Sequence, residues 1–327
     1  MSTRVEIQHS AAPRRARRGS FLQRRDMRPL LILMIPAVII ILIVDLAPVL
    51  LGIWFSTRHL AFSTLSNWVT APWTGFQNYF EALTGGAGLS VSALQATGQS
   101  IAFAVITTAI ALPIGVLAAA TVATRASRAT RWIRALYLIP FALPLFSTAY
   151  LWRMILLPHS GLLDILRRTF GLGDDSNRLL VGQGSFWALV LVDVWFAWGF
   201  IYLFALAGFQ SVDSELYESA ELDGATRWQK FRYVSYPGLR KLLALAIVLS
   251  TVSHYNDFTL PYVLFGSSPP PEVQLLPTLT YQAGFSTYNF GLADAIAVIG
   301  LVTILAPMLI YIWMIFSGDR RERRVRV

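Results

Sequence analysis

Three side chains with different hydrogen-bonding chemistry stand in a strongly apolar segment, residues 242–265. Ser250, His254 and Asp257 are spaced at i, i+4 and i+7, which predicts a hydroxyl, an imidazole and a carboxylate on one helix face. At the helical rise they lie about 12–22 Å from the start of this segment. All three groups can exchange hydrogen bonds with hydroxyl groups, and Asn256 is a polar neighbour. A structural hydrogen bond between the histidine and the aspartate is an alternative of equal weight.

A second polar and aromatic set occupies the apolar segment 185–209, which contains Asp193, Trp195, Trp198 and Phe200. Aromatic faces stack on the apolar C–H faces of sugars, and the carboxylate can accept hydrogen bonds from hydroxyls. Aromatic residues at helical spacing also pack between helices, so helix packing stays open for each ring.

Other chemistry for these groups has less support. A Ser-His-Asp nucleophile array could be drawn with Ser250 or Ser253, but no nucleophile elbow or oxyanion motif accompanies it. A proton relay through His254 and Asp257 would suit a secondary transporter, although such proteins usually have more spans and internal repeats. A membrane-embedded enzyme would need acidic or metal-binding residues clustered at the interface, and the sequence has none. The chain also lacks cysteine, which excludes disulfides and thiolate chemistry.

The segments that hold these residues predict an all-α, polytopic membrane protein. Hydrophobic residues make up 55% of the 327 residues and charged residues only 14%, whereas a soluble chain carries about 25% charge. Apolar runs of roughly 20 residues match the hydrocarbon core of a bilayer, in which the backbone must be helical. We predict six transmembrane helices, at Leu30–Phe55, Ser100–Val122, Ala135–Leu157, Ser185–Phe209, Leu242–Phe265 and Leu292–Phe316.

The prolines inside these spans are expected to kink the helices without ending them, because packed membrane helices re-satisfy the freed backbone groups. They are Pro36, Pro113, Pro140, Pro144, Pro261 and Pro307. Three charged residues nearer the span ends are predicted to be interfacial or snorkelling groups, namely Asp45, Asp294 and Arg153.

Positive charge sets the predicted orientation. Of the 27 lysines and arginines, 22 fall in the two terminal segments and in the loops after the second and fourth spans. Such charge stays cytoplasmic, so both termini are predicted inside a bacterial or archaeal inner membrane. Residues 1–29 and 317–327 are predicted to be basic cytoplasmic tails around a membrane domain, residues 30–316. The first span is too long for a cleaved signal peptide. The arginine-rich N-terminus is interpreted as a topogenic or lipid-facing tail, not as a nucleic-acid site.

The loop between the fourth and fifth spans, residues 213–237, carries the most information. Ser214 is a predicted N-cap with acidic residues in the following turn. Gly224 is a predicted left-handed corner between two short helices, and the second helix, which carries Phe231, is expected to stop before Pro237. Apolar side chains in a charged cytoplasmic loop indicate a docking surface more than a solvated loop.

The string Glu218-Ser219-Ala220-x-x-Asp223-Gly224-Ala225, followed by Phe231 and Pro237, resembles the EAA loop of ABC-importer permeases, with Ser219 where alanine is usual. In that family this loop is the coupling helix that seats in a cleft of the ATPase subunit. The resemblance implies ATPase-coupling residues, which are Glu218, Ser219, Ala220, Asp223, Gly224, Ala225, Trp228, Phe231 and Pro237.

Two other segments extend the resemblance to about residues 30–316. Thr74–Phe80 is similar to the "GLxNY" segment that follows the first span of sugar permeases, and Ile139–Pro144 to the proline-rich start of span three in the maltose-type subfamily. The chain resembles the first-type subunit of such pairs, without its large periplasmic insert. This implies the type I ABC-importer permease fold and three kinds of partner: a second permease subunit, two ATPase subunits and an extracytoplasmic solute-binding protein.

The chain itself carries no phosphate-binding loop, because neither of its two lysines follows a glycine-rich G-x-x-x-x-G-K-[ST] pattern. We therefore expect a transport subunit that is not an enzyme and holds no cofactor, with ATP and Mg²⁺ bound by the partner ATPase subunits.

The resemblance also implies a substrate pathway. Its predicted residues are Phe141, Leu145, Asp193, Trp195, Ala197, Phe200, Ser250, His254, Asn256 and Asp257. The family subunit is richer in asparagine here, so His254 and Asp257 are departures that leave the identity of the sugar open. The implied substrate is a di- or oligosaccharide such as trehalose or a maltose-like sugar. Glycerol-3-phosphate, or a related polyol or phosphodiester, is the alternative; it would favour a buried cation, and only Arg153 lies even partly inside a span.

Overall fold

The computed structural model describes residues 28–123, 127–171, 179–182 and 184–305. Every regular element in these ranges is helical, so the all-α prediction is confirmed. The contacts divide the chain into two units, residues 1–50 and 51–327, which are considered separately. Most of the two predicted basic tails, the end of the sixth span and Pro307 lie outside the described residues.

The first unit holds a helix that changes type without breaking. α1 (Arg28–Ile40) continues through the π-helical η1 (Ile41–Leu46) into α2 (Ala47–Phe55), which runs on past the unit boundary. Pro48 offers no N–H to the carbonyl four residues earlier, and the wider π turn before it accommodates the proline ring. The apolar part, Ile32–Phe55, is long enough to cross a membrane and matches the first predicted span.

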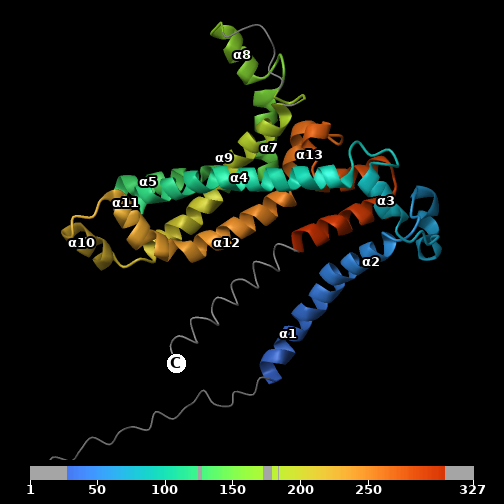
Figure 1. Ribbon diagram of the computed structural model, residues 1–327, viewed down its shortest axis with the longest axis horizontal. Helices are drawn as coiled ribbons and strands as arrows, with labels where there is room; N and C mark the ends of the chain where they lie inside the picture. The colour runs from blue at the N-terminus through green and yellow to red at the C-terminus, as the bar shows by residue number, and fades with distance from the viewer. Residues whose placement is uncertain (1–27, 124–126, 172–178, 183, 306–327) are drawn as a thin grey trace, which may run out of the picture. The chain divides into compact units, whose positions relative to one another are not determined.

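Three helices that pack on one another form the centre of the second unit (Figure 1): α4 (Ala93–Val122), α9 (Gly184–Gln210) and α12 (Tyr236–Tyr255). α4 and α9 approach most closely at Gly115, where an added Cβ would stand 2.8 Å from the Trp198 carbonyl oxygen. A small residue at a membrane helix crossing allows this backbone contact. The second and fourth predicted spans correspond to α4 and α9, and α4 begins seven residues before the predicted Ser100.

The third predicted span is not one helix. It comprises the end of α5 (Arg128–Leu136), then α6 (Ile139–Ala142) and α7 (Leu145–Leu156). The expectation that prolines kink but do not end the spans is wrong here. Pro144 pushes Leu143 into an extended conformation with ψ of 142°, which ends α6, and Pro140 stands in the first turn of that short helix.

The fifth predicted span is also interrupted. α12 ends at Tyr255, residues 256–258 are not helical, and α13 (Thr259–Phe265) follows. Beyond it come η4 (Pro271–Val273), α14 (Leu276–Tyr281) and η5 (Gln282–Ser286), and then an apolar helix over Phe290–Leu305. This last helix begins two residues before the sixth predicted span.

The remaining helices lie in the connections. They are η2 (Phe62–Thr70), α3 (Gln77–Thr84), α8 (Leu162–Thr169), α10 (Ser214–Leu222), α11 (Arg227–Lys230) and the π-helical η3 (Phe231–Ser235). In the segment after the first span, the buried Asn78 donates to the carbonyls of Ser56 (2.9 Å) and Arg58 (2.8 Å). The asparagine of the "GLxNY"-like string therefore organises the chain that leaves the membrane.

Within the described residues, three helices are long and apolar enough to cross a membrane: the helix ending at Phe55, α4 and α9. The helix Phe290–Leu305 is shorter, and the third and fifth predicted spans are broken. The number of six spans therefore stays a prediction.

Candidate functional site

The predicted coupling loop, residues 213–237, folds as short helices around a glycine corner. Gly224 has φ of +73°, and its N–H donates to the carbonyl of Glu221 (3.0 Å). The next N–H, of Ala225, donates to the carbonyl of Ala220 (2.9 Å). This pair of bonds is a Schellman motif, which satisfies the last carbonyls of α10. The predicted left-handed corner is confirmed.

Two boundary predictions for the coupling loop are wrong. The N-cap of α10 is Asp213 and not Ser214, and no side chain caps the helix there. The second helix does not stop before Pro237, because α11 continues through η3 directly into α12. Pro237 stands in the first turn of α12, and the wider turn of η3 before it accommodates the proline ring.

Side chains tie the two halves of the coupling loop together. Lys230 Nζ donates to Glu221 Oε1 at 2.6 Å, and the hydroxyls of Tyr217 and Ser235 lie 2.9 Å apart. The hydrogen bond from Lys230, and then its charge, lower the pKa of Glu221 below its ordinary value. Because Glu221 is exposed, water screens this pair, which orients the loop more than it stabilises it.

The outer surface of the coupling loop mixes charge with apolar side chains. Leu222 is 90% exposed, Trp228 67% and Leu216 53%. The Trp228 ring lies 5.7 Å from the half-buried ring of Phe231. Large apolar groups exposed together on a polar loop are typical of a docking surface.

The other residues predicted to couple lie on or beside this surface. Glu218, Ser219, Asp223, Gly224 and Pro237 are exposed, and Ala220 and Ala225 are half-buried.

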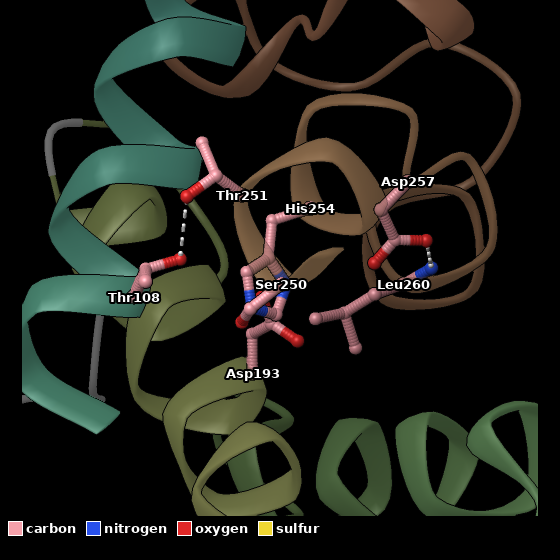
Figure 2. A network of polar contacts seen from close by, with 7 residues as sticks. All are labelled: Thr108, Asp193, Ser250, Thr251, His254, Asp257 and Leu260. Atoms are coloured by element: carbon pink, nitrogen blue, oxygen red, sulfur yellow. Dashed lines mark hydrogen bonds and ion pairs between the residues drawn. The ribbon is translucent and has the colours of Figure 1, made fainter. Parts of the chain in front are cut away.

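A second polar cluster joins α9 to α12 (Figure 2). His254 Nδ1 lies 2.8 Å from Asp193 Oδ2, and His254 Nε2 lies 2.9 Å from Ser250 Oγ. The three residues, here called the polar node, are 7%, 2% and 3% exposed respectively. Both ring nitrogens of the histidine thus face an oxygen inside the unit.

α4 completes the surroundings of the polar node. The Phe103 ring stands nearly edge-on to the His254 ring at 6.1 Å between centroids. One turn away, Thr251 Oγ1 donates to Thr108 Oγ1 at 3.4 Å. The three central helices therefore converge at the node, in which polar groups meet polar groups inside an apolar bundle.

The prediction of one helix face with Ser250, His254 and Asp257 is wrong for its third member. α12 ends at Tyr255, so Asp257 lies in the break before α13. Its Oδ1 accepts from the N–H of Leu260, in the first turn of α13, at 3.2 Å (Figure 2), and the N-cap position itself is Phe258. The carboxylate beside the histidine ring is that of Asp193, on the neighbouring helix.

Aromatic predicted pathway residues gather on the α6 and α7 side of α9. The Phe141 ring lies 5.7 Å from each of the rings of Phe196 and Phe200. Trp195 meets Trp152 of α7 nearly edge-on at 6.0 Å. All five rings are half-buried, so helix packing accounts for part of their contact area.

The other predicted pathway residues lie apart. Ala197 is buried in α9, and Leu145 is half-buried at the start of α7. Asn256 is exposed and lines a cavity of about 740 Å³ together with Phe285 and Asp294. Asp294, which was predicted to be an interfacial group, faces this cavity. The structure therefore divides the predicted pathway among the polar node, the aromatic cluster and the α12–α13 break.

Sequence reasoning missed two pairings. Arg153 does not only snorkel, because its Nη1 donates to the Val263 carbonyl in α13 at 2.9 Å. Asp193 and His254 were each predicted to contact a substrate, and their contact with one another was not predicted. A signal was available, since polar groups inside adjacent apolar spans usually pair. In the described ranges, no group of three or more His, Asp or Glu residues is arranged to hold a metal ion.

Comparison with a solved structure defines the class of this fold. The chain is similar to a chain of a bacterial ABC transporter involved in the import of the acidic polysaccharide alginate, with a TM-score of 0.69. The likeness covers 85% of this chain and 93% of that one at 21% identity. The fold is thus that of an ABC-importer permease.

The sequence places the chain in a family. The family model described as "Binding-protein-dependent transport system inner membrane component" matches residues 111–327, and the chain belongs to this family. It is 25% identical over 294 residues to the trehalose/maltose transport system permease protein MalF of Thermococcus litoralis, covering 90% of this chain and 95% of that protein. It is 27% identical over 277 residues to the sn-glycerol-3-phosphate transport system permease protein UgpA of Agrobacterium fabrum, covering 84% and 90%.

Proposed function

We propose that this chain forms one half of the translocation pore of an ATP-driven importer for a di- or oligosaccharide. The observation that carries the proposal is the coupling loop. It presents Leu216, Leu222 and Trp228 to a partner, and it is continuous with two helices of the membrane bundle. A partner that moves this loop therefore moves α9 and α12 with it.

The partners follow from the family and from what the chain lacks. Membership of a binding-protein-dependent family supports a solute-binding protein outside the membrane. The absence of a phosphate-binding loop from the sequence requires ATP and Mg²⁺ to be held by separate ATPase subunits, docked on the coupling loop. A second permease subunit supplies the other half of the pore. Both termini then lie in the cytoplasm of a bacterial or archaeal cell.

A neutral sugar is the favoured substrate. The relative named for trehalose and maltose aligns over 90% of this chain, and Phe141, Phe200 and Asn256 offer ring faces and an amide for sugar stacking and hydrogen bonding. The relative named for sn-glycerol-3-phosphate keeps that substrate as the second candidate. An anion would favour a cation inside the bundle, and Arg153, which keeps its charge while it donates to a carbonyl of α13, is the residue that would supply it.

Uptake by a reconstituted complex tests the proposal. The chain, its co-purifying subunits and the binding protein are placed in liposomes, and accumulation of labelled trehalose, maltose or glycerol-3-phosphate is followed with and without ATP. We expect ATP-dependent uptake of a disaccharide and none from a pH gradient alone. Uptake that needs only a pH gradient would favour a proton-coupled secondary transporter, and uptake of glycerol-3-phosphate alone would identify the second candidate.

A further inference from the structure

The polar node lies between the two arms of the coupling loop. α9 ends at Gln210 and leads into α10 after three residues, and α12 continues directly from η3. The chain from α9 to α12 is therefore one helical hairpin with the coupling loop at its tip. A displacement applied at the tip reaches the membrane bundle along these two helices.

The hairpin is fastened near its tip. The ion pair of Lys230 with Glu221 and the hydroxyl contact of Tyr217 with Ser235 join its two sides. Next to these contacts the two arms lie close together at Gly208 of α9 and Leu239 of α12. A Cβ added to Gly208 would stand 3.2 Å from the Cα of Leu239. At this end the two arms cannot slide far without a clash.

The second fastening is the polar node, far along α12. His254 is eighteen residues beyond the start of α12, a distance of about 27 Å along a helix. Separation of the arms here would take the buried Asp193 carboxylate away from His254 Nδ1, while the ring would keep only its contact with Ser250 on the same helix. Breaking such a buried pair is strongly unfavourable. The node therefore adds a polar connection between α9 and α12 deep in the bundle.

α12 ends directly after the polar node. Two residues beyond His254 the chain leaves the helical conformation, and Asn256 and Asp257 lie in this break. Residues 256–258 are not helical and Asp257 accepts from the N–H of Leu260, so α13 is a separate short helix with its own N-terminus. A rigid arm followed by a non-helical joint is the arrangement of a lever and hinge.

We propose that the polar node is a clamp that makes α9 and α12 move as one body, with residues 256–258 as the hinge at its end. Asp193, His254 and Ser250 are then positioning residues, which act on the substrate pathway through Asn256 and Asp257 and do not touch the sugar. Their low exposure agrees with this role. The proposal rests on the proposed function, because it assumes a motor that moves the coupling loop.

The absence of cysteine from the chain allows a clean test of the clamp. A single reporter cysteine, Asn256→Cys, is placed at the hinge of the complete complex, and its maleimide labelling rate is measured by mass spectrometry of this chain with and without ATP. We expect ATP to change the rate by at least about fivefold, at the lower end of typical coupling energies. Adding Asp193→Ala should abolish this ATP effect while ATP hydrolysis continues.

Three further variants control for folding and for the alternative role. Asp193→Asn keeps an acceptor oxygen in place and should retain the ATP effect, as should Ser253→Ala, which changes an exposed neighbour of the node on α12. The exchange Asp193→His with His254→Asp should restore the ATP effect even if Asp193→Ala fails to assemble. If Asp193 and His254 bound the sugar instead, exchanging their positions would not be expected to restore the ATP effect.

The outcomes separate the clamp from the proposed function. An unchanged ATP effect in Asp193→Ala overturns the clamp even where the complex takes up sugar. Failure of the exchange to restore the ATP effect also overturns the clamp. If the reporter at residue 256 does not respond to ATP when Asp193 and His254 are unchanged, residues 256–258 are not a hinge. Absence of ATP-driven sugar uptake by the complex that retains Asn256, with the ATP effect at the hinge intact in the reporter variant, instead removes the proposed substrate and leaves the clamp standing.

Discussion

The corner at Gly224 allows a graded test of the coupling loop, because its cost can be worked out from the backbone. Its φ is +73°, a conformation that costs an L-residue about 1–2 kcal/mol. Nothing lies within 4 Å of a Cβ added there, so the cost of Gly224→Ala is conformational and not steric. Because no packing holds the corner, this free-energy cost should reduce the fraction of chains in the docking conformation. The affinity for the ATPase subunit should therefore decrease by about 5- to 30-fold.

Two further substitutions extend this series. Gly224→Asn should have a smaller effect than alanine, because asparagine adopts the left-handed conformation more readily. Gly224→Pro fixes φ near −65° and removes the N–H that donates to Glu221, at a cost of about 3 kcal/mol or more. Affinity should therefore fall in the order Gly, Asn, Ala, Pro.

The assay is titration of the detergent-purified complex with the ATPase subunit, together with uptake in vesicles. Gly171 is a matched control, since it has φ of +67° and equally open surroundings but lies after α8, outside the coupling loop. Gly171→Ala should leave ATPase affinity unchanged. Equal ATPase affinity for the alanine, asparagine and proline variants of Gly224 would refute the reasoning.

Three other predictions follow from close contacts in the bundle. Gly115→Val should destabilise the chain by about 1–3 kcal/mol, because its Cβ would stand 2.8 Å from a backbone carbonyl of α9. Gly98→Val is the control, since a Cβ added there meets open space. Equal melting temperatures of the two variants in detergent would contradict the close contact between α4 and α9. Arg153→Leu removes the donor to the Val263 carbonyl of α13 and should lower the free energy of unfolding by about 1.5–3 kcal/mol. An unchanged melting temperature would contradict this prediction. Asp257→Ala removes the acceptor for the Leu260 N–H in the first turn of α13, worth about 1 kcal/mol, and should weaken uptake while ATPase subunits still co-purify. Undiminished uptake would remove this residue from the pathway.

Local patterns predicted the features of this chain that depend on local physics. The glycine corner follows from one residue type in an otherwise helical loop, and the structure confirms it at Gly224. The i, i+4 spacing of Ser250 and His254 predicted their shared helix face correctly, whereas the contact between their side chains was not predicted. The first, second and fourth spans followed from apolar length alone.

Proline effects and partner choice could not be predicted in the same way. Pro237 and Pro144 have the same chemistry, yet one is absorbed by a π turn and the other ends a short helix, because the outcome depends on how neighbouring helices fix the chain on either side. The end of α12 at Tyr255 moved Asp257 off the predicted face. Asp193 became the partner of His254 because α9 and α12 are adjacent, which is a tertiary fact that residue spacing does not encode.

The central claim is that the coupling loop faces the cytoplasm and is covered by a separate ATPase. A single cysteine at the exposed Glu218 measures both at once, through labelling by a membrane-impermeant maleimide in right-side-out and inverted vesicles. We expect labelling only in inverted vesicles stripped of their ATPase subunits, and protection when those subunits are restored. Labelling from the outer side, or unchanged labelling when the ATPase is present, would contradict it.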